Sequence, residues 1–141
     1  MREKSGFTLI ELVLVISIVA ILIMAVGLTS GVRETAKVHS AAESVKALRT
    51  AAESYIAAGN MTYTGISVSG LQTLGFLPAS FSATGSNPWG GNYAVAVNTD
   101  TGKVDISITS VTAASATRLS TLFANSAAAT NYSGGTWTVT F

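Results

Sequence analysis

The N-terminal third of the chain carries two successive patterns of apolar side chains. Residues 7–28 form a nearly unbroken apolar run, interrupted by Thr8, Glu11, Ser17 and Gly27. Read as a helix that rises about 1.5 Å per residue, this run spans the ~30 Å hydrocarbon core of a bilayer. It is therefore predicted to be a transmembrane helix.

After residue 28 the apolar side chains recur at spacings of three and four, which predicts an amphipathic helix. The repeating positions are Val38, Ala42, Val45, Leu48, Ala52 and Tyr55. No proline or long polar linker separates the two patterns, so one helix is expected from Phe7 to Ala58. Gly59-Asn60 supplies its stop signal.

The rest of the chain is predicted to form a small antiparallel sheet. Residues 60–92 are rich in Gly, Ser, Thr and Asn, which indicates a connecting loop with one helical turn near residues 70–74. Residues 93–97 and 104–108 alternate with period two around a turn, so they are expected to pair as a hairpin. Thr136 to Phe141 alternates in the same way and is expected to be a third strand.

Between the hairpin and the last strand, residues 113–124 predict a short helix that packs on the sheet edge through Ala116, Leu119, Leu122 and Phe123. Residues 125–135 are expected to be a loop, held by contacts other than a disulfide or else mobile. The fold class predicted is α+β: a long N-terminal helix packed on a small antiparallel sheet.

Composition and charge exclude several classes of protein. Of the 141 residues only 11% are charged, and the mean hydropathy of +0.48 is too high for an ordinary soluble domain. The net charge of +1 shows no basic footprint for nucleic acid. Cysteine is absent, which excludes disulfides and thiolate sites.

The first six residues, Met1 to Gly6, are polar and basic, and they directly precede the apolar run. Arg2 and Lys4 place this end on the cytoplasmic side of a membrane, so the remainder is expected outside. A secretory signal peptide is the competing interpretation, but it requires a shorter apolar region that ends in an Ala-x-Ala-like cleavage site.

Gly6-Phe7-Thr8-Leu9-Ile10-Glu11-Leu12, with the aliphatic run to Val26, resembles the processing and assembly motif of type IV pilins and pseudopilins. The resemblance implies a leader peptide at residues 1–6, a transmembrane and assembly helix at 7–28 and a globular pilin domain at 29–141. It also implies that a membrane aspartyl peptidase cuts after Gly6 and methylates the new amino group of Phe7. Glu11 then occupies the place of the family's assembly glutamate.

The same resemblance implies a set of partners and a location. The partners expected are identical or homologous pilin subunits in a helical polymer, the prepilin peptidase, the inner-membrane assembly machinery and, before assembly, lipid. No cofactor, metal or nucleic acid is expected. The precursor is expected in the inner membrane and the assembled filament on the cell surface.

Glu11 also has a physical interpretation that does not depend on the family. A carboxylate within an apolar helix costs a few kcal/mol on insertion scales, so it marks a candidate functional site with a partner. The family's proposed partner is the Phe7 amine of a neighbouring subunit. The alternative is that Glu11, one turn into the helix, reaches the headgroup region as an anchor.

Asn87-Pro-Trp-Gly-Gly-Asn-Tyr93 resembles Pro-Trp-Gly segments that precede the sheet in pseudopilins and in several type IVb pilins. Trp89 is interpreted as a core residue of a tight turn, in which Pro88 sets φ and Gly90-Gly91 adopt conformations forbidden to other residues. The functional alternative makes Trp89 a subunit contact or an adhesive surface.

Three functions remain: the subunit of a pilus, a pseudopilin of a type II secretion system, and a membrane-anchored binding protein. Simple anchoring does not need Gly6-Phe7 or Glu11. Major pseudopilins often carry a calcium site in their C-terminal loops, and Asp100 and Asp105, the only acids after Glu53, are too few for its carboxylate cage. An enzyme is not expected, because no nucleophile motif, acid pair or phosphate loop is present.

Overall fold

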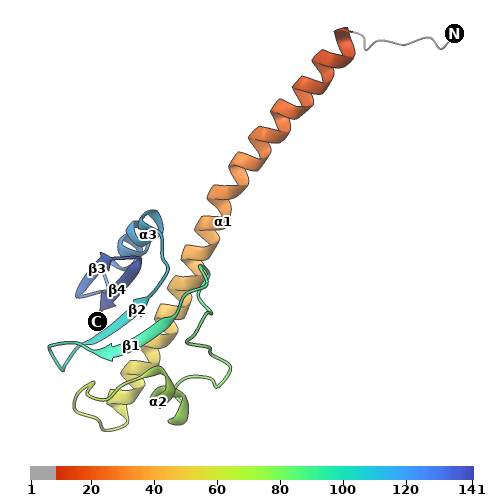
Figure 1. Cartoon of the computed structure of the whole chain (residues 1–141). Coiled ribbons are helices and arrows are strands. Elements are labelled where there is room, and N and C mark those ends of the chain that lie inside the picture. Colours follow the sequence, from red (N-terminus) through yellow and green to blue (C-terminus); the bar gives the residue numbers. More distant parts are fainter. Residues whose placement is uncertain (1–8) are drawn as a thin grey trace. The chain divides into compact units, whose positions relative to one another are not determined.

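The computed structural model describes residues 9–141, apart from the side chains of residues 25–30. The chain divides into two compact units, Met1–Thr35 and Ala36–Phe141. The second unit contains the sheet and the core, and its architecture is α+β as the sequence predicts (Figure 1).

Helix α1 (Leu9–Ala57) is continuous over 49 residues, which confirms that the two apolar patterns belong to one helix. It ends where Gly59 adopts a φ of 106°, a left-handed conformation that favours glycine at a helix C-terminus. The side chain of Asn60 donates to the Tyr55 carbonyl oxygen at 2.9 Å and so satisfies one of the last open acceptors.

The predicted helical turn in the connecting segment is α2 (Val68–Thr73). Ser67 caps its N-terminus by accepting a hydrogen bond from the Gly70 amide at 3.1 Å. Val68 and Leu71 are buried and anchor the segment to the core. These two apolar side chains therefore hold an otherwise polar segment against the core.

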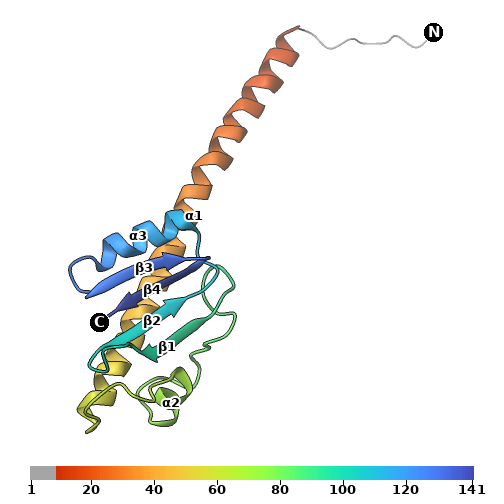
Figure 2. The same cartoon turned by 60° about the vertical axis from the view of Figure 1, so that its left-hand side comes forward.

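The sheet has four antiparallel strands in the order β1-β2-β4-β3, as Figure 2 shows. Strands β1 (Tyr93–Val97) and β2 (Val104–Ile108) form the predicted hairpin with the predicted bounds. Strand β4 (Thr136–Thr140) pairs with β2, so that Ile106 lies opposite Val139.

Strand β3 (Ala129–Ser133) corrects the sequence prediction, because residues 125–135 were expected to form a loop. It pairs antiparallel with β4 along its whole length. All five of its residues are exposed, so no alternation of buried and exposed side chains marks it in the sequence. Only its pairing with β4 defines it as a strand.

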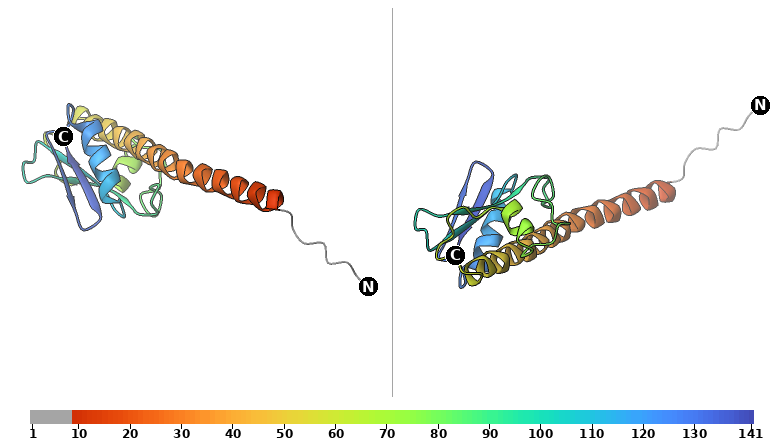
Figure 3. Two further views of the ribbon diagram at one scale, coloured as in Figure 1. Left: turned by 90° about the horizontal axis from the view of Figure 1, so that it is seen from above. Right: turned by 90° about the horizontal axis from the view of Figure 1, so that it is seen from below.

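Helix α3 (Ala113–Phe123) lies on the same side of the sheet as the second half of α1 (Figure 3). Its buried residues include Ala116, Leu119 and Phe123, as predicted. Leu122 was also expected to face the sheet, and this was wrong, because it lies one position off the buried stripe and is 49% exposed.

The core of the second unit lies between the sheet and the helices. From the sheet come alternate residues of β1, β2 and β4, and from α1 come the predicted repeating positions together with Ala41 and Ala51. The fully buried members with the largest side chains are Trp137, Leu48, Leu71, Ile106, Ile108, Leu119, Val45, Val104 and Val139. Burial of this apolar surface holds the unit together without disulfides.

Candidate functional site

The described N-terminal part of α1, from Leu9 to Met24, exposes apolar side chains on every side of the helix. The least exposed of its large apolar residues is Val19 at 47%, and the most exposed is Leu9 at 82%. A helix that is hydrophobic all round is normally covered by lipid or by protein. This segment is therefore the strongest candidate for a contact surface in the described chain.

Glu11 lies in the first turn of α1 and is exposed. A carboxylate at this end of a helix interacts favourably with the positive end of the helix dipole. Ser17, the other polar residue of the segment, donates its hydroxyl to the Val13 carbonyl oxygen at 2.7 Å. That internal bond satisfies the hydroxyl within the helix itself. Glu11 carries the only charged side chain between Leu9 and Met24.

Gly6 and Phe7, the predicted processing and methylation residues, lie outside the described residues, as do Arg2 and Lys4. The predicted membrane segment, residues 7–28, extends beyond the described part at both ends, because it includes Phe7, Thr8 and the side chains of residues 25–28. Among the described residues, no helix has the length and apolarity needed to cross a membrane.

The segment around Trp89 folds as a turn organised by Asn87, whose side chain is buried. Its Oδ1 accepts hydrogen bonds from the amides of Trp89 and Gly91, both at 2.9 Å, and its Nδ2 donates to the Thr109 carbonyl oxygen at 2.7 Å. Gly90 has a φ of 79°. A Cβ at Gly91 would lie 2.3 Å from the Thr109 oxygen, so only glycine fits there.

Trp89 is half-buried and packs against the core, as the core interpretation predicts. The turn therefore has a structural role: it joins the connecting segment to the end of β2. Asn87 was not predicted as its organiser. Its place two residues before Trp89 and four before Gly91 is the spacing at which an Asn side chain bonds to following amides.

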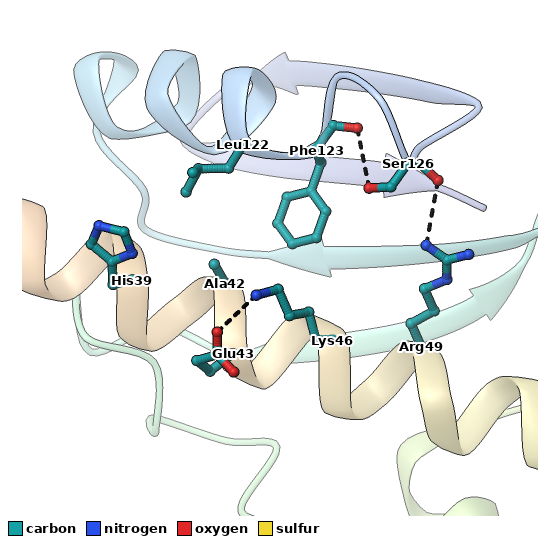
Figure 4. Close-up of a pocket in the computed structure, with 8 residues that line it drawn as sticks. All are labelled: His39, Ala42, Glu43, Lys46, Arg49, Leu122, Phe123 and Ser126. Carbon is teal, nitrogen blue, oxygen red and sulfur yellow. Dashed lines mark hydrogen bonds and ion pairs between the residues drawn. The ribbon is translucent and has the colours of Figure 1, made fainter.

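A hollow of about 340 Å³ lies between α1 and the C-terminal end of α3 (Figure 4). Its lining residues are His39, Ala42, Glu43, Lys46, Arg49, Leu122, Phe123 and Ser126.

The charged side chains of the hollow bond to neighbouring groups of the protein. Lys46 Nζ lies 2.8 Å from Glu43 Oε1, and Arg49 Nε lies 2.8 Å from Glu53 Oε1. Arg49 also donates to the Ser126 carbonyl oxygen at 3.4 Å and covers the Phe141 ring at 4.5 Å. The contacts of Arg49 with Ser126 and Phe141 join α1 to the C-terminal half of the unit.

The two aspartates of the second unit are engaged in local bonds. Asp100 pairs with Lys103 at 3.1 Å, and the hydrogen bond from the Lys103 side chain, with a second from the Gly102 amide, holds the pKa of Asp100 below its ordinary value. Asp105 accepts both from Asn98 Nδ2, at 2.9 Å, and from Thr140 Oγ1, at 2.6 Å. Both carboxylates therefore stabilise the hairpin and its junction with β4.

Comparison with known protein families gives one match: the model of the prokaryotic N-terminal methylation motif matches residues 1–27. The match supports a type IV pilin-like prepilin. The match covers the leader, Gly6-Phe7 and the exposed apolar part of α1 that includes Glu11, which confirms the predicted resemblance.

Comparison of the chain with curated proteins and with solved structures found no match. The pilin-like family that the motif indicates comprises structural subunits. Pilin-like prepilins are processed by a prepilin peptidase and assemble into polymers with other pilin subunits. The motif ends before the second unit begins, so the comparisons bear on the N-terminal helix alone.

Proposed function

We propose that this prepilin is the structural subunit of a type IV pilus. In the proposal the leader, residues 1–6, is removed, Phe7 is N-methylated, and the subunits polymerise through the N-terminal part of α1 into a filament on the cell surface. The observation that carries the proposal is the methylation motif on a helix whose described N-terminal part, Leu9 to Met24, has all its large apolar side chains about half exposed or more. Such a helix gains free energy by packing with others like it.

Before assembly, residues 7–28 anchor the subunit in the inner membrane with the globular domain, residues 29–141, outside. The length of the apolar run and the positive residues before it support this arrangement. The prepilin peptidase and the inner-membrane assembly machinery act on the chain in this state.

Glu11 selects the axial register of an incoming subunit in this mechanism. When helices bundle in the filament, an unpaired carboxylate costs several kcal/mol in the low effective dielectric. The new amine of Phe7 on a neighbouring subunit offsets that cost only when the two subunits are in register. The aliphatic side chains of Leu9, Leu12 and their successors supply most of the attraction.

A pseudopilin of a type II secretion system is the second candidate function. The two aspartates of the second unit favour the pilus, because Asp100 pairs with Lys103 and Asp105 accepts from Asn98 and Thr140. Two carboxylates in separate local networks do not form a cage of six to eight oxygens for Ca²⁺.

Processing can be tested by mass spectrometry of filaments sheared from cells. The expected chain begins with N-methylated Phe7, and an intact Met1 in assembled protein would contradict the proposal. Gly6→Ala should be processed in part, whereas Gly6→Trp should block processing, because the peptidase approaches this backbone closely. Electron microscopy of wild-type and deletion cells then separates a surface pilus from a short periplasmic structure.

The role of Glu11 can be tested with Glu11→Gln as the sole subunit. Processing and membrane insertion should be unchanged, but filament number should fall about tenfold or more, since ~1.4 kcal/mol per contact changes an association constant tenfold. Glu43→Gln is the matched control, because it makes the same chemical change at an exposed position of the same helix. Normal piliation by Glu11→Gln would remove Glu11 from the mechanism and leave helix packing alone.

A further inference from the structure

Strand β3 forms an edge of the sheet and is open to solvent. All five of its residues are exposed, and β4 is its single neighbour in the sheet (Figure 2). Residues 119–141 contain no charged side chain and no proline. Charges and prolines are the usual means by which proteins prevent edge strands from pairing with other chains.

The ladder shows which backbone groups of β3 point away from the sheet. Val104 and Phe141 exchange two hydrogen bonds of 3.0 Å, so Phe141, Val139 and Trp137 bond towards β2. Thr136, Thr138 and Thr140 therefore bond towards β3, where their partners are Ser133, Asn131 and Ala129. The N–H and C=O groups of Thr130 and Tyr132 are left pointing outwards.

The opposite edge of the sheet is less open, because the amide of Tyr93 in β1 donates to the Ala83 carbonyl oxygen at 2.8 Å. At the start of β3 the Ala128 amide donates to the Thr140 oxygen, at 2.8 Å, although Thr140 lies opposite Ala129. Two residues thus oppose one, which is a β-bulge. The regular, unoccupied part of the edge runs from Thr130 to Ser133.

We propose that β3 pairs antiparallel with β3 of a second copy of this chain, about a two-fold axis at Asn131. Thr130 of each copy then lies opposite Tyr132 of the other, and the two pairs exchange four backbone hydrogen bonds. A β-branched residue opposite an aromatic one is a favourable cross-strand pair. Because the strand is uncharged, it does not repel its own copy.

The contact is isologous, so it joins two subunits and stops. It deepens the proposed function, on which it rests: the paired subunits belong to neighbouring pili, and β3 is the surface through which pili associate laterally. One strand pair is a weak contact. Repetition along two filaments raises the total affinity without any new kind of contact.

A single introduced cysteine tests the pairing, because the chain has no other thiol. In the proposed register the two Asn131 residues form a non-hydrogen-bonded pair with Cα atoms about 4.5 Å apart, which is within disulfide range. Under mild oxidation, Asn131→Cys should give about fivefold or more disulfide dimer than Thr99→Cys, an exposed control on the β1–β2 turn. Equal cross-linking of the two variants would overturn the proposal.

Charge exchange gives an independent measurement on filaments. Asn131→Lys and Asn131→Asp should each leave pili single, because like charges face each other across the pair. Mixing the two kinds of filament should restore bundles in electron micrographs. Thr99→Lys is the matched control for net charge and should bundle as the wild type does. Failure of the mixture to bundle would contradict the proposed register.

The proposal and the proposed function fail in different ways. Single pili whose Asn131→Cys subunits stay monomeric overturn the edge pairing and leave the pilus intact. Absence of filaments from wild-type cells overturns the pilus, and the same cross-link on detergent-extracted protein then decides the pairing. A cross-link from Asn131→Cys to a different protein shows that another chain occupies the edge, and it would also overturn the self-pairing.

Discussion

Asn87 illustrates how much of this fold depends on a single polar side chain. It is 4% exposed, and its side chain bonds to four backbone groups: the Trp89 and Gly91 amides and the Asn92 and Thr109 carbonyl oxygens. Buried polar groups without a partner are costly, so removal of the Asn side chain affects each group that it satisfies.

Asn87→Ala should therefore destabilise the second unit by about 2 to 4 kcal/mol, because it leaves the Trp89 and Gly91 amides and the Thr109 carbonyl without this partner. Thermal unfolding of the detergent-solubilised chain, followed by near-ultraviolet circular dichroism, would measure the loss. Asn92→Ala is the control, because Asn92 is exposed and its side chain accepts one bond, from the Gly85 amide. Equal melting temperatures for the two variants would show that Asn87 does not organise the turn.

Strand β4 joins the sheet to α3 through a buried side chain. Trp137 is fully buried, its Nε1 donates to Ser120 Oγ of α3 at 2.9 Å, and its ring lies 5.7 Å from that of Phe123. The strict alternation of residues 136–141 predicts the buried face of this strand, and the burial of Trp137 and Val139 confirms it.

Trp137→Ala should cost about 3 to 5 kcal/mol, a large share of the stability of a small domain, because it removes a large buried ring and leaves a cavity. Ser120→Ala should cost about 1 kcal/mol, since it removes one hydrogen bond. Denaturant unfolding of both variants would separate the contribution of the buried ring from that of the hydrogen bond. Thr138→Ala, at a half-exposed position on the same strand, is the control. An unchanged unfolding midpoint for Trp137→Ala would contradict the packing described.

The β1–β2 turn should respond to acid through Asp100. Its folded-state pKa lies below its ordinary value because of the Lys103 and Gly102 hydrogen bonds. The stabilisation is present above the pKa of the unfolded chain and is lost as the pH falls through the lower, folded-state pKa. The Asp100 side chain is 58% exposed and bonds only within the turn, so the effect is local to the turn.

Nuclear magnetic resonance titration of the Asp100 carboxyl carbon should give a pKa below that of an unfolded peptide. Lys103→Ala should move it upwards, towards the ordinary value, while Lys46→Ala, at an exposed lysine outside the turn, should leave it in place. No response to Lys103→Ala would rule out this pair as the cause.

The charges of the whole chain are balanced in a way that bears on assembly. The proposed removal of Met1 to Gly6 would take two of the eight basic and one of the seven acidic side chains, so the processed chain would keep six of each. Residues Leu9 to Met24, the described part of the segment proposed for assembly, contribute one of these charges, Glu11. Attraction between subunits should accordingly depend little on exposed charges.

Sheared filaments should stay assembled as NaCl rises from ~0.1 to ~1 M, although the screening length falls from about 10 Å to about 3 Å. A Glu11 pair buried between helices is screened far less than surface charges. Detergent should dissociate the filaments, because it covers the apolar helices. Sedimentation of filaments in salt and in detergent would compare the two, and dissociation by salt alone would show that surface ion pairs hold the subunits.

The sequence alone determined the elements in which apolar side chains face the core and polar side chains face water. Helix α1, the hairpin and β4 bury one set of positions, and the period of that set is visible as 3.6 or 2 residues. The methylation motif could likewise be recognised in the sequence, because a peptidase recognises a short contiguous segment. These features depend on neighbours in the chain, so no knowledge of the fold was needed to find them.

Tertiary structure decided what depends on residues far apart in the chain. Strand β3 exposes every side chain, so only its hydrogen bonds to β4 make it a strand and only the strand order makes it an edge. Asn87 acquires its role from Thr109, 22 positions away, and Leu122 is exposed because the buried stripe of α3 passes beside it. Backbone pairing and packing between distant segments leave no periodic signal in the sequence, which is why these features emerged from the folded chain.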